Sequence, residues 1–182
     1  MILIDMRKTA SKLDDFRAEK DDFFANDPRS PLNPHQRRLF KRLAYFDENP
    51  RLVIKAKIDR GVEPGEVRME TTTGKEQVYR RYGVVRFQAG GEAAQVTLFS
   101  SDASHELFLP FRDATSGKET YAAGRYLDLH AHGDDIVIDF NYAYNPNCAY
   151  DAAWSCPLPP AENWLKVAIR AGEKDFPVGP AH

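Results

Sequence analysis

The chain has 182 residues, of which 42% are hydrophobic and 29% are charged. A chain of this size and composition fits one globular domain better than two, so we expect residues 1–182 to form a single domain. Lysine and arginine total 25 against 27 aspartate and glutamate residues. This balance excludes the net basic charge that would attract nucleic acid or an anionic membrane surface.

The start of the sequence, Met-Ile-Leu-Ile-Asp, holds too few apolar residues for a signal peptide. No later stretch approaches the roughly 20 apolar residues that span a membrane. We therefore expect a cytoplasmic protein without membrane or nucleic-acid partners. In that compartment Cys148 and Cys156 are expected to be free thiols, although their spacing would also allow a disulfide.

Two helices are predicted within residues 1–49. The first begins after a cap at Thr9 or Ser11, with Asp14 at capping-box spacing from Ser11, and ends near Ala25.

The second helix has the stronger start signal. Asn33 is a good cap, Pro34 suits the first helical position, and Gln36 stands at the capping-box position. We expect this helix to continue until the chain approaches Asn49 and Pro50.

Residues 50–174 are predicted to be mostly strand, with a loose tail over 175–182. From Leu52 the apolar residues alternate with polar ones, as in a half-buried strand, and glycine-containing turns divide the following segments into hairpins. The predicted fold is mainly β (α+β), an antiparallel barrel-like or sandwich domain with an N-terminal helical pair. The predicted strands cover 52–59, 67–71, 77–89, 95–100 and 164–170.

A hairpin is predicted from Arg125 to Tyr142. Placing its loop at residues 132–135 sets Leu129 opposite Ile138 and segregates the apolar side chains on one face. The other face then sets Asp128 opposite Asp139. Two facing carboxylates need a shared proton, a cation or a ligand donor. Alternatively, the pair faces solvent or Asp139 accepts backbone hydrogen bonds in the following loop.

The histidines of this hairpin offer a second pattern. His130 and His132 are two residues apart and, with Asp128, are ligand types that zinc accepts. The set is incomplete and His132 falls in the predicted turn, so we expect exposed histidines and no metal site.

The segment Thr115-Ser116-Gly117-Lys118 resembles a phosphate-binding loop, but it lacks the opening glycine and a Ser or Thr after the lysine. We expect a turn there. Cys148 has no local signature of a catalytic nucleophile, and no cofactor is specified by any motif.

The run from Asp139 to Asn163 gathers both cysteines and many hydrogen-bonding and aromatic side chains between two predicted strands. Arg125 either turns inward and pairs with Asp113 or Glu162, or binds a carboxylate or phosphate. The predicted ligand-binding candidates are Asp113, Tyr121, Arg125, Tyr126, Asp139, Asn141, Tyr144, Asn145, Cys148, Tyr150, Cys156, Glu162 and Asn163.

Three functions stay open. The first is a small-molecule-binding β domain with a polar and aromatic site near residues 139–163. The second is a hydrolase or lyase in which Asp139 or Asp128 is the base, Tyr121 or Tyr126 the proton donor and Arg125 the anion partner.

The third function is a protein-interaction module that presents the 139–163 segment, and an exposed Trp154 would favour it. Whether the protein is an enzyme, and its oligomeric state, are not fixed by the sequence.

Several longer motifs occur together in a fixed order between Asn33 and Lys174. The motifs are 111–121, Gly124-Arg125-Tyr126-Leu127, 139–150, 156–163 and Ala171-Gly172-Glu173. They resemble a prokaryotic family, the domain of unknown function 1684. This resemblance implies that the polar positions belong to a family pattern, and it implies no reaction. Tyr142 stands where the resemblance leads us to expect arginine, and Asn147 where it leads us to expect proline.

Overall fold

The computed structural model describes residues 11–63 and 65–177. It divides the chain into two compact units, Met1–Arg42 and Leu43–His182. Thr9, one of the two predicted caps, and residues 178–182 of the predicted tail lie outside the described residues. Across the described ranges, no helix is both long enough and apolar enough to cross a membrane.

The first unit contains two helices, α1 (Lys12–Asn26) and α2 (Pro34–Leu39). Both begin with the predicted capping boxes: Ser11 accepts from the Asp14 amide at 3.1 Å, and Asn33 accepts from the Gln36 amide at 2.9 Å. These local starts are confirmed.

The predicted length of α2 is wrong, because the helix ends at Leu39. Beyond it, Phe46 and Lys174 donate backbone hydrogen bonds to Gly172 and Ala44 respectively, each within the second unit. Residues 44–46 are thus held extended by a distant part of the chain, which overrides their helical pattern.

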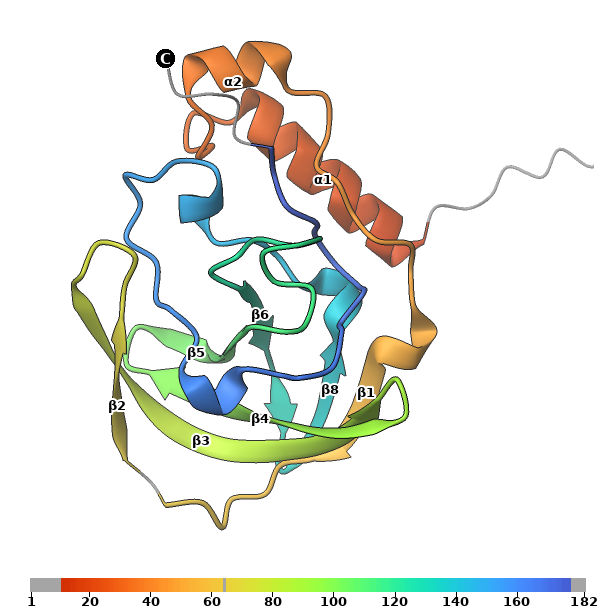
Figure 1. Ribbon diagram of the computed structural model, residues 1–182, viewed down its shortest axis with the longest axis vertical. Coiled ribbons are helices and arrows are strands. Elements are labelled where there is room, and N and C mark those ends of the chain that lie inside the picture. The colour runs from red at the N-terminus through yellow and green to blue at the C-terminus, as the bar shows by residue number, and fades with distance from the viewer. Residues whose placement is uncertain (1–10, 64, 178–182) are drawn as a thin grey trace, which may run out of the picture. The chain divides into compact units, whose positions relative to one another are not determined.

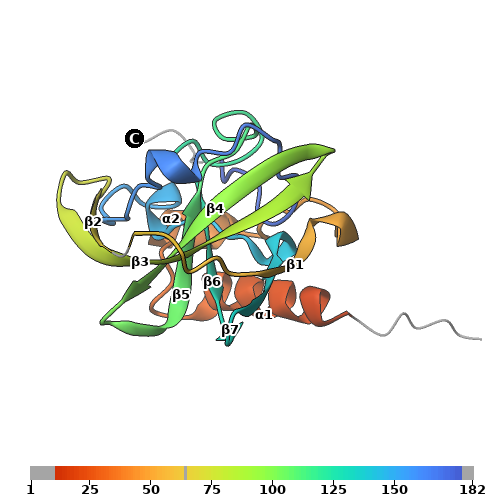
Figure 2. The same cartoon turned by 90° about the horizontal axis from the view of Figure 1, so that it is seen from below.

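The second unit is built from antiparallel strands in two sheets (Figure 1). One sheet has the order β1-β8-β7 and the other the order β2-β3-β4-β5-β6. Figure 2 shows β3 and β4 as a long curved pair. The strands are β1 (Val53–Lys57), β2 (Glu66–Glu70), β3 (Glu76–Ala89), β4 (Glu92–Ser101), β5 (Ser104–Phe111), β6 (Arg125–Leu129), β7 (Ala131–His132) and β8 (Asp135–Asp139).

The described residues also contain short 3-10 helices, namely η1 (Pro50–Leu52), η2 (Phe140–Tyr142), η3 (Asn147–Ala149) and η4 (Ala161–Asn163). Asp59, just after β1, makes a bridge with Val84 of β3, and the two sheets do not close into a barrel. The predicted mainly β, antiparallel fold with two N-terminal helices is therefore confirmed.

The predicted hairpin register is correct only near its turn. Ala131 pairs with Ile136 as expected, but β6 leaves β8 and pairs with β5 instead, so that Asp128 lies opposite Phe108. Asp139 lies opposite Val53 on β1. The predicted Asp128–Asp139 pair is wrong because β6 and β8 belong to different sheets.

The predicted last strand, 164–170, is not a strand in the structure. It bends at Lys166 and Val167 and makes a bridge between Trp164 and Arg112. Its Ile169 amide donates to the Asp113 carboxylate at 2.6 Å, and the Ile169 carbonyl accepts from Arg125 at 2.8 Å. Side chains therefore take the backbone hydrogen bonds that a neighbouring strand would otherwise supply.

The five-stranded sheet has an inner and an outer face. Leu127 and Leu129 of β6 point into the main hydrophobic core, together with Leu109 of β5 and Ile169. Because successive residues of a strand alternate between faces, Tyr126 and Asp128 point outward. The outer face is where the 139–163 segment contributes its own side chains.

Candidate functional site

Arg125 lies on the inner face of β6 and is 0% exposed. Its guanidinium donates hydrogen bonds to the carbonyls of Ile169 at 2.8 Å, Glu173 at 3.1 Å and Ala171, and lies 3.5 Å from an Asp113 oxygen. Burial lowers the pKa of Arg125, and the Asp113 charge opposes that effect. Arg125 thus holds the 169–173 backbone in place, and the predicted pairing with Asp113 is confirmed.

The Asp113 carboxylate is buried and occupied by several donors. Thr115 donates its hydroxyl to both oxygens at 2.9 Å, and the Ile169 amide donates at 2.6 Å. The neighbouring residues 115–120 form the predicted turn, in which Gly117 has a φ of 78°. Asp113 therefore joins the turn to Arg125 and residues 169–173.

Glu173 is a second buried carboxylate, 1% exposed. It accepts from the Tyr150 hydroxyl at 2.6 Å and the Asn145 amide at 2.8 Å, while the Asn145 side chain donates to the Lys174 carbonyl at 2.8 Å. Tyr150 and Asn145, two predicted ligand candidates, are therefore tied to the C-terminal segment by internal hydrogen bonds.

Asn163 joins η4 to the sheet. Its side chain accepts from the Thr97 amide at 2.7 Å and donates to the carbonyls of Thr97 and Pro110. Glu162 beside it forms an ion pair with Arg81 at 2.9 Å rather than with Arg125. Both residues fasten the segment after Pro160 onto the sheet.

Asp139 and Asn141 also bond internally. The Asp139 carboxylate accepts from the Asn141 backbone amide at 3.0 Å. This agrees with the predicted alternative in which Asp139 accepts backbone hydrogen bonds in the following loop. The Asn141 side chain exchanges hydrogen bonds with the backbone of Asn49 at 2.7 and 3.1 Å. Arg125, Asp128 and Asp139 thus lie in three different surroundings and do not form one catalytic set.

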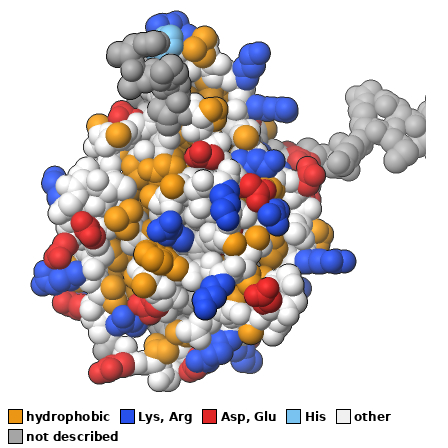
Figure 3. Space-filling view, viewed as in Figure 1, with side chains coloured by type: hydrophobic (Ala, Val, Ile, Leu, Met, Phe, Trp, Pro, Cys, Tyr) orange, Lys and Arg blue, Asp and Glu red, His pale blue; other side chains and the backbone are white. Residues whose placement is uncertain are grey.

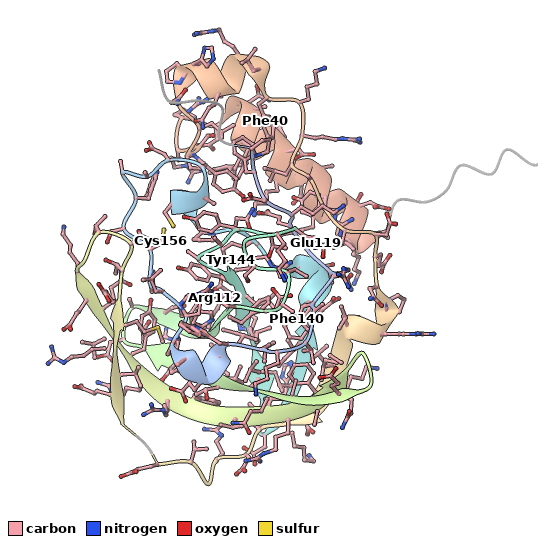
Figure 4. The ribbon with its side chains drawn as sticks, viewed as in Figure 1. Phe40, Arg112, Glu119, Phe140, Tyr144 and Cys156 are labelled. Carbon is pink, nitrogen blue, oxygen red and sulfur yellow. The ribbon has the colours of Figure 1, made fainter. Side chains whose placement is uncertain are left out.

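The outer face carries a small cluster separate from the main core. Tyr126, Cys148 and Cys156 are its buried members, and Phe108, Tyr121 and Tyr144 pack against it half-exposed. Figure 4 labels Tyr144 and Cys156, which belong to this cluster. We call this group the aromatic–thiol cluster.

The rings of the cluster contact one another edge to face. Phe108 and Tyr126 have centroids 4.8 Å apart at 73°, and Tyr126 and Tyr144 lie 5.9 Å apart at 89°. Tyr79 of β3 stacks on Phe108 at 5.2 Å and is itself half-exposed. The Tyr126 hydroxyl donates to the Pro157 carbonyl, which fixes its ring beneath the covering segment.

Asp128 adjoins these rings. Its carboxylate accepts from the Tyr144 hydroxyl at 2.5 Å, and its direct cross-strand neighbour is Phe108. Partial burial raises the pKa of the Asp128 carboxyl; the Tyr144 hydrogen bond lowers it and the charge of Glu106 raises it. The residue as a whole is exposed, so its carboxylate is shielded mainly on the side of Tyr144.

The two thiols lie side by side. The Cys148 amide donates to the Cys156 sulfur at 3.3 Å, and the Tyr121 hydroxyl lies 3.7 Å from the Cys148 sulfur. The hydrogen bond from the Cys156 thiol lowers the pKa of Cys148 to about 7 against the opposing effect of burial, with further lowering by Tyr121 and Thr72. The same pairing raises the pKa of Cys156.

The hairpin histidines lie beyond Asp128. His130 pairs with Glu106 at 3.0 Å and is close enough to Asp128 to act on its pKa. His130 and His132 also line an open hollow of about 510 Å³ beside Lys55 and Lys57. In the described ranges, no group of three or more His, Cys, Asp or Glu side chains is placed to hold a metal ion.

Three residues important to this region were not among the predicted candidates. Glu173 lies in a family motif for which the sequence predicts no binding role. Tyr79 lies in a segment that the sequence predicts to be an ordinary strand, and Phe108 lies in the apolar run 107–111. The sequence does contain a signal for Phe108. Leu107, Leu109 and Phe111 alternate with it along the strand, which predicts that Phe108 points away from the face that these three residues bury. Tyr79 carried no such signal, since its neighbour in space belongs to a distant strand.

Comparisons with known proteins agree with the fold and identify a family. A family model described as "Protein of unknown function (DUF1684)" matches residues 38–174. The solution NMR structure of an uncharacterized protein from Haloarcula marismortui is similar, with a TM-score of 0.69 and 40% identity over 89% of this chain and 91% of that one. No curated protein matches the chain. The chain therefore belongs to the DUF1684 family, whose function is unknown.

Proposed function

We propose that the protein binds a small organic cation, such as an amine or a quaternary ammonium compound, on the outer face of the five-stranded sheet. The observation that carries the proposal is the Asp128 carboxylate, which adjoins Tyr144 and Phe108 on a face that is open to solvent. Aromatic faces attract cations through the ring quadrupole, and a neighbouring carboxylate adds a direct charge.

Several predicted polar candidates are held by internal hydrogen bonds instead. Arg125 donates to backbone carbonyls in the core, Asn163 bonds to Thr97, and Asn141 bonds to Asn49. A cation on the outer face would meet the rings of Tyr79, Phe108 and Tyr144, each of which is partly exposed.

The charge around Asp128 favours a cation over an anion. Glu106 is close enough to raise the pKa of Asp128, and Asp128 in turn raises the pKa of Tyr79 after the larger effect of burial. An anionic ligand placed here would meet the Asp128 carboxylate and, beside it, Glu106, which pairs with His130. A cation would relieve the repulsion between them.

Amide NMR chemical shifts on titration with choline test the proposal, with the neutral tert-butyl analogue of choline as control. Choline should shift the amides of β5 and β6 near Phe108 and Asp128, and the neutral analogue should not. Asp128→Asn should weaken the choline response by about tenfold or more, since the direct charge is lost. No shifts, or equal shifts with the neutral analogue, would contradict it.

A protein-interaction role is the second candidate, favoured by Trp154. This side chain is 43% exposed, although its backbone is fixed by bonds with Thr72 at 3.0 Å and Asp151 at 3.2 Å. Figure 3 shows hydrophobic side chains among interspersed acidic and basic ones on one face of the molecule. Analytical ultracentrifugation with Trp154→Ala as a comparison tests self-association; a monomer in both cases counts against a dimer.

A further inference from the structure

The Cys148 and Cys156 thiols are held close to each other by elements on both sides. Cys148 belongs to the turn η3. Cys156 is fixed through Thr72, which accepts from its amide at 3.1 Å and donates its own amide to the Cys156 carbonyl at 2.9 Å. The Cys156 sulfur lies 3.3 Å from the Cys148 nitrogen. The reduced chain therefore already brings the two side chains together.

The surroundings of the two sulfurs are polar as well as aromatic. The Tyr121 hydroxyl lies 3.7 Å from the Cys148 sulfur, and the Cys148 amide donates to the Cys156 sulfur at 3.3 Å, so each sulfur has a hydrogen-bond donor beside it. Inert structural cysteines usually pack among apolar side chains, whereas reactive ones have donors that stabilise a thiolate. The pair also lies outside the main core, with 8% and 7% of the two residues exposed.

We propose that Cys148 and Cys156 form a redox-active pair that exchanges with small disulfides, with Cys148 as the attacking thiol and Cys156 as the resolving thiol. This inference is independent of cation binding. The Cys148 thiolate attacks a low-molecular-weight disulfide, forming a mixed disulfide and releasing one thiolate. Cys156 then loses its proton and attacks the Cys148 sulfur, releasing the second thiolate. Two cysteines are oxidised and one external disulfide is reduced to two thiols.

The order of attack follows from the Tyr121 hydroxyl, which lies 3.7 Å from the Cys148 sulfur and can stabilise a thiolate there. The lowered pKa of Cys148 and the raised pKa of Cys156 agree with this order. Once the Cys148 sulfur is bound in a mixed disulfide it carries no negative charge, so the proton of Cys156 is released more easily. In a reducing cytoplasm, the location expected from the sequence, the pair would return to the dithiol state.

Oxidised glutathione and intact-protein mass spectrometry test the proposal on the full native chain. The wild-type protein should lose the mass of two hydrogen atoms and both titratable thiols. Cys156→Ser retains a hydroxyl beside Cys148 and should instead accumulate one glutathione as a mixed disulfide. Cys148→Ser should react about tenfold more slowly, because the thiol that adjoins the Tyr121 hydroxyl is lost.

Two controls keep the result decisive. Circular dichroism and thermal midpoints identify any serine variant that fails to fold, and the corresponding alanine variants then replace it. The rate is also measured in low urea. The proposal is overturned if wild-type thiols stay unreacted, if only two-glutathione adducts form, or if the rate rises with urea in parallel with unfolding, since the thiols would then react only in the unfolded chain.

Discussion

Arg125 and Tyr126 are neighbours in sequence, but their side chains lie on opposite faces of β6. Arg125 points into the core and bonds to the 169–173 backbone, whereas Tyr126 points outward and bonds to Pro157. Strand alternation makes this separation unavoidable. The predicted hydrolase arrangement, which joined Arg125 to Tyr126 and an aspartate, therefore has its groups on two sides of one sheet.

The buried position of Arg125 predicts a large loss of stability when its charge is removed. Arg125→Gln would leave the Asp113 carboxylate without its cation and at least one backbone carbonyl without a donor. We expect a loss of about 3–5 kcal/mol in the free energy of unfolding, measured by urea denaturation.

Arg80→Gln is the matched control, because Arg80 pairs with Asp102 at 2.6 Å on the exposed surface. Its unfolding midpoint should hardly move. Similar losses for the two variants would mean that Arg125 does not hold the 169–173 segment as described.

Substitution of Gly172 should also cause a large loss in the free energy of unfolding. Its φ is 77°, and a Cβ atom there would lie 2.5 Å from the Ala143 carbonyl oxygen. Gly90 has a φ of 59° but nothing within 4 Å of such an atom. Gly90→Ala should therefore cost about 1–2 kcal/mol for the left-handed backbone alone.

Gly172→Ala should exceed that loss by about 2 kcal/mol or more, because overpacking is added. Thermal and urea unfolding of the two alanine variants, made in the same background, give the comparison. Equal losses would show that residues 172 and 143 can move apart without cost.

Local signals predicted the helix starts well and the strand partners less well. The capping boxes at Ser11 and Asn33 depend on residues three apart, so the sequence contains the whole interaction. The partner of β6 is a non-local choice. Pairing with β5 or β8 buries similar apolar side chains, and residues 125–142 alone cannot decide between them.

The same distinction applies to the candidate site. Asn163, Asp113 and Tyr150 bond to Thr97, Ile169 and Glu173 respectively, which lie far away in sequence. The neighbouring sequence does not distinguish a polar residue that binds a ligand from one that bonds to a distant backbone carbonyl. Only the fold shows which hydrogen bonds are already made.

The raised pKa of Asp128 predicts how cation binding depends on pH. The folded chain holds this proton more tightly than a free aspartate, whose pKa is about 3.9. Choline affinity should therefore fall as the pH drops, with a midpoint above that ordinary value. The contribution of Asp128 to stability should likewise decrease as the pH rises from the ordinary value through the raised one.

Choline titrations by NMR across acidic pH check this prediction, and Asp128→Asn should remove the pH dependence in that range. The variant also has to remain folded, as shown by an unchanged amide spectrum away from β6. An affinity that stays constant down to the ordinary aspartate pKa would assign the cation to another group.

The Cys148 thiol should ionise at a lower pH than an ordinary cysteine. Hydrogen bonding from Cys156 lowers its pKa to about 7, and the Tyr121 hydroxyl acts in the same direction. Alkylation of Cys148 by iodoacetamide, followed by peptide mass spectrometry, should therefore show a midpoint near that value rather than the usual value of about 8.5.

Cys156→Ala removes the largest cause of the lowered Cys148 pKa and should move the midpoint upward. Cys156→Ser should move the midpoint less, because a hydroxyl can still donate. Tyr121→Phe should give a smaller upward shift. If all three variants keep the wild-type midpoint, the contacts between these side chains do not set the ionisation of Cys148.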